Sequence, residues 1–115
     1  MIGLGPSRRY FFYCQPADMR NGFDGLSALV RTGMRQDPMS GDVFVFVNRR
    51  RSHLKALTWD RNGFAIFYKR LEAGTFELPK AETPTWAQMV MLLEGVSLKS
   101  ARYRCRYAVE GRKSG

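Results

Sequence analysis

The chain has 115 residues, of which 44% are hydrophobic and 13% aromatic, enough for one packed domain and too many for global disorder. Lys and Arg number 19 against 10 Asp and Glu, a formal net charge of +9, and there are one His and two Cys. These counts exclude a zinc finger, a four-cysteine metal cluster, a disulfide framework and a carboxylate-rich metal cage as the dominant feature. The basic excess predicts an acidic or polyanionic partner.

The sequence also bears on the compartment. No run approaches the ~18 apolar residues that a membrane span needs, and residues 1–10 lack the basic-then-apolar pattern of a signal peptide. Two cysteines fit a reducing compartment. We therefore expect a cytoplasmic, nucleoid-associated protein without a membrane partner.

The first half of the chain predicts a strand, a helix and a second strand. Residues 10–14 form a short aromatic run that Gln15 and Pro16 stop, which is typical of a strand. Asp24 is a candidate N-cap for a helix that extends to Arg35, because apolar residues follow it at helical spacing. Residues 43–47 are β-branched or aromatic throughout, which predicts a central strand covered on both faces.

The second half predicts further strands and another helix. Strands at 53–60 and 64–71 flank an Asn-Gly hairpin signal, and residues 74–79 resemble a short last strand. Thr83 and Pro84 fit the N-cap and first position of a helix that Gly95 would end.

This order of elements predicts an α+β fold in a single small domain at residues 1–98. Its mostly antiparallel sheet would have about five strands, with two helices packed on it. Residues 99–115 form a basic tail, with six Lys and Arg against Glu110 alone. In the tail Arg102, Arg104 and Arg106 alternate with other residues, so an extended conformation would place the three guanidinium groups on one face. Such a segment could follow a phosphate backbone, whereas the alternative is a basic, disordered terminus.

The inventory of reactive groups argues against catalysis. His53 stands beside an arginine run, where positive charge disfavours its role as a general base. The acidic residues fall at expected caps, turns and element ends rather than in one converging group. No glycine-rich phosphate loop is present. We therefore predict no enzyme activity, no cofactor and no metal.

The basic residues are the most informative part of the sequence. Arg49, Arg50 and Arg51 are consecutive between two apolar strands, so a short hairpin loop must project them beyond the sheet. Guanidinium groups bind phosphate in a bidentate manner, although a run of charge can equally be a solvated surface loop. The predicted nucleic-acid-binding set comprises Arg20, Arg49, Arg50, Arg51, Lys55, Lys69, Arg70, Arg102, Arg104 and Arg106. The turn that contains Arg20 is either structural or an interaction surface.

Six stretches, in this order, resemble one family: residues 18–26, 37–46, 49–51, 54–60, 69–76 and 91–96. The chain is similar over residues 2–98 to the small TnpB-type accessory protein, the second open reading frame, of bacterial insertion sequences of family sixty-six. The resemblance implies a non-catalytic protein of DNA transposition that acts beside a separate transposase. It does not extend to the tail after Lys99.

Two functions follow as hypotheses. In the first, the arginine loop binds DNA phosphates, at insertion-sequence ends or non-specifically, and assists the transposase. In the second, the protein is an interaction module that docks on the transposase without contacting DNA.

Overall fold

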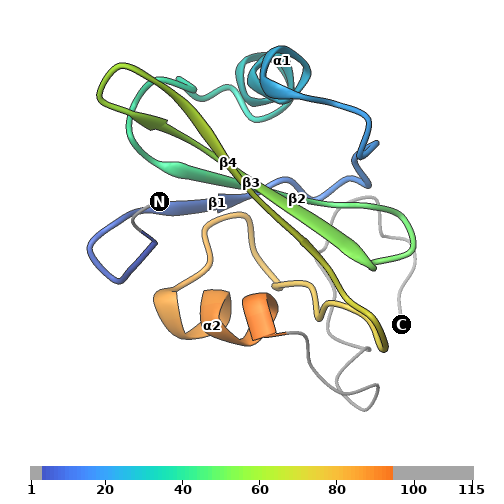
Figure 1. Cartoon of the computed structure of the whole chain (residues 1–115). Coiled ribbons are helices and arrows are strands. Elements are labelled where there is room, and N and C mark those ends of the chain that lie inside the picture. The colour runs from blue at the N-terminus through green and yellow to red at the C-terminus, as the bar shows by residue number, and fades with distance from the viewer. Residues whose placement is uncertain (1–3, 95–115) are drawn as a thin grey trace.

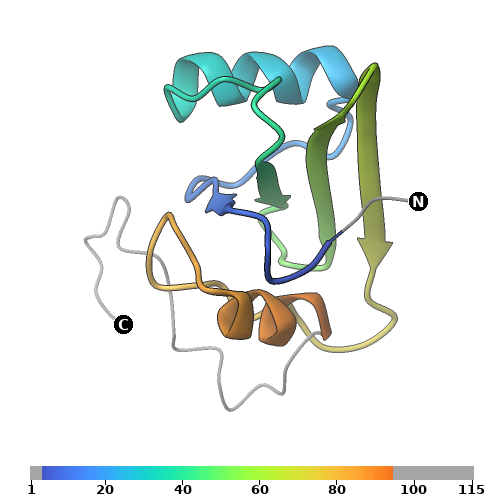
Figure 2. The same ribbon diagram turned by 90° about the vertical axis from the view of Figure 1, so that its left-hand side faces the viewer.

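The computed structural model describes residues 4–94, which form a sheet with one helix on each face (Figures 1 and 2). The elements in chain order are β1 (Tyr10–Phe12), α1 (Phe23–Gly33), β2 (Val43–Val47), β3 (His53–Asp60), β4 (Gly63–Arg70) and α2 (Trp86–Glu94). The α+β class and the two helices are confirmed, but the sheet has four strands rather than about five. Within residues 4–94, neither helix has the length and hydropathy needed to cross a bilayer.

The four strands lie side by side in chain order. β1 pairs with β2 in parallel across the α1 connection, whereas β2–β3 and β3–β4 are antiparallel. The predicted hairpin is present, with Asp60 opposite Gly63, and the residue of positive φ in its turn is Arg61 at 57°. β2 is the predicted central strand, and all five of its residues are buried.

The two faces of β2 support two separate hydrophobic cores. Val43, Val45 and Val47 belong to the core under α2, which also takes Met89 and Leu92 of that helix. Phe44 and Phe46 point to the other face and pack with Leu26 and Val30 of α1. Successive side chains of a strand alternate between faces, so an uninterrupted apolar run is what a strand between two helices requires.

The predicted strand at residues 74–79 is wrong. This segment follows β4 and crosses the face that α2 covers, where Phe76 and Leu78 are buried in the core. Its backbone is tied to the rest of the fold by a bond from the Phe76 N–H to the Arg51 carbonyl, 2.8 Å long. The apolar residues of this segment therefore mark its burial in the core, and the segment does not pair with a strand.

Both predicted N-caps differ from the observed ones by two residues. The N-cap of α1 is Gly22, and Asp24 lies in the first turn, where a carboxylate suits the helix dipole. At α2, Thr85 and Gln88 form reciprocal bonds of 2.8 and 3.2 Å between side chain and backbone N–H, a capping box. The N-cap of α2 is therefore Thr85, and the predicted cap Thr83 lies before it. Gly95 and the tail lie outside the described residues.

Candidate polyanion-binding surface

The loop between β2 and β3 (residues 48–52, the Arg loop) has a backbone fixed by Asn48. The side-chain oxygen of Asn48 accepts bonds from the N–H groups of Ser52 and His53 at 2.9 and 3.0 Å, and its carbonyl accepts the Arg51 N–H at 3.0 Å. Arg51 adopts a φ of 60°, which closes the turn. The loop therefore presents its arginines from a defined backbone.

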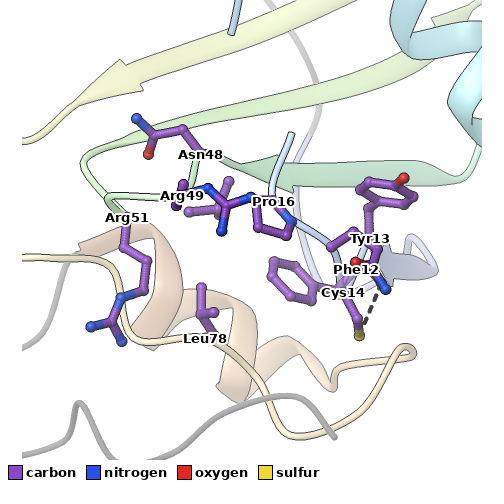
Figure 3. Close-up of a pocket in the computed structure, with 10 residues that line it drawn as sticks. Phe12, Tyr13, Cys14, Pro16, Asn48, Arg49, Arg51 and Leu78 are labelled. Atoms are coloured by element: carbon purple, nitrogen blue, oxygen red, sulfur yellow. Dashed lines mark hydrogen bonds between the residues drawn. The ribbon is translucent and has the colours of Figure 1, made fainter. Parts of the chain in front are cut away.

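The three arginines of the Arg loop do not share one environment. Arg49 and Arg50 are exposed at the tip, and neither forms an ion pair or hydrogen bond in the part of the chain that the structure describes. Arg51 is half-buried and lines a hollow together with Leu78 of the segment that crosses the α2 face (Figure 3). Arg49 and Arg50 thus project from the loop as predicted, whereas Arg51 is partly covered.

Two hollows lie on either side of the segment that follows β1. One, of about 250 Å³, lies where the parallel strands β1 and β2 end, and Phe12, Val47, Arg49 and Arg51 line it (Figure 3). The second, of about 470 Å³, is lined by residues 16–19 and 48–50. Crevices beyond the carboxyl ends of parallel strands are common ligand sites. Arg49 borders both hollows, so it is placed to contact whatever enters either one.

Arg20 borders this region but is already paired. Its guanidinium donates to both carboxylate oxygens of Asp18, the shortest bond being 2.7 Å, and both side chains are exposed. Hydrogen bonds from Arg20 lower the pKa of Asp18 from 3.8 to about 2. The ionised pair therefore favours the folded state above about pH 4, and this contribution is lost as the pH falls toward 2. A phosphate would have to compete with Asp18 for Arg20.

Lys55 has partners within the fold. Its ammonium donates to the carbonyls of Met19 and Asn21 at 2.9 and 2.7 Å and lies 4.9 Å from the ring centre of Tyr68. It thereby fixes the turn that precedes α1. These contacts account for the Lys55 charge without a nucleic-acid ligand.

The two cations of β4, Lys69 and Arg70, lie on opposite faces of the sheet. Lys69 points to the opposite face of the sheet from Lys55, where its ammonium bonds the Leu93 carbonyl near the end of α2. Arg70 is exposed but pairs with Glu72 at 2.8 Å, which raises the pKa of the arginine. The register that separates these side chains was not fixed by the sequence. Arg102, Arg104 and Arg106 lie outside the described residues.

The assignment of Lys55 gives a first prediction. Lys55→Met should lower the free energy of unfolding by about 1–2 kcal/mol, because two partly buried carbonyls lose a charged donor. The salt dependence of DNA binding should stay unchanged. Urea unfolding and a salt titration of binding measure the two quantities, and an unchanged stability with a shallower salt slope would return Lys55 to the binding set.

Neither the two hollows nor the role of Asn48 in the Arg loop could be predicted from the sequence. An asparagine beside a charge run is unremarkable in a sequence, and its role depends on which strands pair. The segment after β1 contains the predicted turn with Arg20, and its position beside the Arg loop follows from the parallel β1–β2 pairing. The sequence feature that could have indicated this region is the apolar strand β2, which ends directly before Asn48.

Comparison with known proteins identifies the family. The profile described as "IS66 Orf2 like protein" matches residues 8–103, five residues beyond the limit of the resemblance seen in the sequence. The uncharacterized protein y4jC of Sinorhizobium fredii is 42% identical over 78 residues, 66% of this chain and 67% of the relative. A second uncharacterized protein of that organism, y4hO, is 35% identical over 100 residues, 84% of this chain and 87% of the relative. No solved structure matches. The chain belongs to the IS66 Orf2-like family and is an accessory protein associated with transposition.

Proposed function

We propose that this protein binds DNA phosphates through the tip of the Arg loop and assists a separate transposase. The observation that carries the proposal is that the Lys and Arg residues of the predicted binding set differ in whether they have a partner within the fold. Arg20, Arg70, Lys55 and Lys69 each have a partner within the fold, whereas Arg49 and Arg50 have none among the described residues. Two guanidinium groups on a fixed loop beside two hollows are suited to bidentate contact with phosphate.

The proposed contacts position DNA without reading its sequence. Two arginines at one loop tip reach the backbone of a duplex, but recognition of bases needs side chains inserted along a groove. The net charge of +9 adds long-range attraction. The protein would therefore hold DNA non-specifically, and selection of the insertion-sequence ends would come from the transposase.

A gel-shift titration of the purified full chain tests the proposal. Duplexes with insertion-sequence ends, random duplexes and single strands are compared at several salt concentrations. We expect similar affinities for the two duplexes and a steep loss of binding with salt, with a log–log slope of about −0.9 per phosphate contact. Absence of binding at low salt, with a nuclease-resistant complex with the transposase, would favour the protein-interaction module instead.

Asp18 offers a second prediction at the same surface. Asp18→Asn removes a carboxylate beside the Arg loop and releases Arg20, while the amide oxygen can still accept the Arg20 N–H that Asp18 binds at 2.9 Å. We expect DNA affinity to rise by about three- to tenfold, with a slope steeper by roughly one contact. Glu72→Gln, which releases Arg70 in the same way, is the control for a general effect of net charge.

A further inference from the structure

The two edges of the sheet are covered differently. β1, at one edge, has three residues, and the Phe12 N–H donates to the Glu82 carbonyl at 2.6 Å on the side away from β2. β4, at the other edge, has eight residues and is the outermost strand (Figure 2). Within residues 4–94, no backbone hydrogen bond reaches β4 from the side away from β3. The sheet therefore has one covered edge and one open edge.

The backbone groups that point to the open edge follow from the register. The Leu71 N–H donates to the Ser52 carbonyl at 2.9 Å, and these two residues extend the β3–β4 register by one position. In an antiparallel pair, hydrogen-bonded and non-hydrogen-bonded residue pairs alternate. Counting back from Leu71, every second residue of β4 bonds β3. The N–H and carbonyl groups of Phe64, Ile66 and Tyr68 therefore point away from the sheet.

The open edge is also apolar and unprotected. Residues 64–68 are all hydrophobic and none is fully covered, whereas every residue of β2 is buried. Proteins commonly protect such an edge with a proline, a β-bulge or a lysine at the edge. β4 contains no proline, its register with β3 is continuous, and the Lys69 ammonium bonds the Leu93 carbonyl of α2. An edge of this kind is suited to bind a further strand.

We propose that the open edge of β4 pairs with β4 of a second copy of this chain. The two strands would run antiparallel about a two-fold axis, with Ile66 opposite Ile66 of the second copy. Phe64 then lies opposite Tyr68 of the second copy, so the outward backbone groups of all three residues meet partners. The same register places one aromatic ring opposite another, which stabilises a cross-strand pair. The strand is thus complementary to itself.

The charges near β4 favour this antiparallel arrangement. Residues 62–68 carry no charge. Asp60 and Arg61 lie at one end of the strand, and Arg70 pairs with Glu72 at the other end, 2.8 Å apart. Antiparallel pairing brings together two ends that each carry one charge of either sign. Parallel pairing of identical strands in register would instead set Arg70 opposite Arg70, which is destabilising.

The dimer would present two Arg loops. The Arg loop precedes His53, which lies opposite Arg70 at one end of the hairpin. Because the two-fold axis reverses the strand direction, the two Arg loops would lie at opposite ends of the joined sheet. This consequence, unlike the pairing itself, rests on the proposed function: the dimer would hold one DNA segment at each loop.

Hydrogen exchange and sedimentation equilibrium of the full chain without DNA test the pairing. Salt at about 0.3 M screens the repulsion between two basic chains. We expect a dimer mass at about 500 µM and a monomer mass at about 5 µM. Exchange at the amides of Phe64, Ile66 and Tyr68 should be about tenfold slower or more at the higher concentration. The amides of Ala65 and Phe67, which bond β3, should be protected at both concentrations.

Two variants at one position separate the backbone from the side chain. Tyr68 is 53% exposed, and Tyr68→Pro removes its outward N–H without removing a bond to β3. We expect this variant to be a monomer at every concentration. Tyr68→Thr, the matched control, loses the same ring but keeps the N–H and should still dimerise. Urea unfolding checks that both variants fold, and if Tyr68→Pro does not, the exchange pattern of the parent decides.

Several outcomes would overturn the proposal. They are a monomer mass throughout, a dimer whose Phe64, Ile66 and Tyr68 amides exchange freely, and protection of these amides that is independent of concentration. Protection that appears only when the transposase is added would assign the edge to a strand of that protein. Replacing Arg49 and Arg50 with alanine should leave dimerisation unchanged, so the pairing and the proposed DNA contact can fail separately.

Discussion

Replacing both Arg49 and Arg50 with alanine is expected to weaken binding to random duplex DNA by on the order of 100-fold at low salt. Both side chains are exposed and have no partner among the described residues, so their loss removes charge from the surface without breaking a contact in the fold. The log–log slope with salt should fall by about 0.9 per arginine, because each releases counterions from one phosphate. Thermal unfolding should be unchanged within error, and gel shifts at four salt concentrations give the slope.

The matched control removes the same charge elsewhere. Arg31 lies in the last turn of α1, and Arg61 lies in the turn at the opposite end of β3 from the Arg loop. Arg31→Ala combined with Arg61→Asn, the latter chosen because Asn tolerates the positive φ of that turn, lowers the net charge equally. If the two double variants lose the same affinity, binding depends on net charge and the Arg loop has no special part.

The sequence predicted the position of the Arg loop better than the roles of the surrounding cations. Three arginines between two apolar strands have no place but a loop, so Arg49 and Arg50 could be placed at its tip. The partners of Lys55 and Lys69 could not be placed, because they are backbone carbonyls that lie 34 and 36 residues from Lys55 and 24 residues from Lys69 along the chain. The face of the sheet to which each of these side chains points can be assigned only when the register of the paired strands is known.

The topology of the sheet could likewise be predicted only in part from the sequence. Composition identified β2 as central, because only a strand covered on both faces needs five apolar residues in a row. It did not identify the parallel pairing of β1 with β2, which depends on how α1 carries the chain across the sheet. That pairing creates the crevice beside the Arg loop. The candidate site is therefore a product of topology as much as of charge.

Phe44→Ala should produce the largest loss of stability, about 3–5 kcal/mol, a large fraction of the 5–15 kcal/mol typical of a domain. Phe44 is fully buried between β2 and α1, and its ring stacks on Phe11 with centroids 5.5 Å apart. The deletion leaves a cavity in the smaller of the two cores, on the strand that carries the Arg loop. Urea unfolding measures the change, and Phe23→Ala, which truncates a ring that is 50% exposed at the start of α1, should cost under about 1 kcal/mol. Similar losses for both variants would mean that α1 does not seal this face of the sheet.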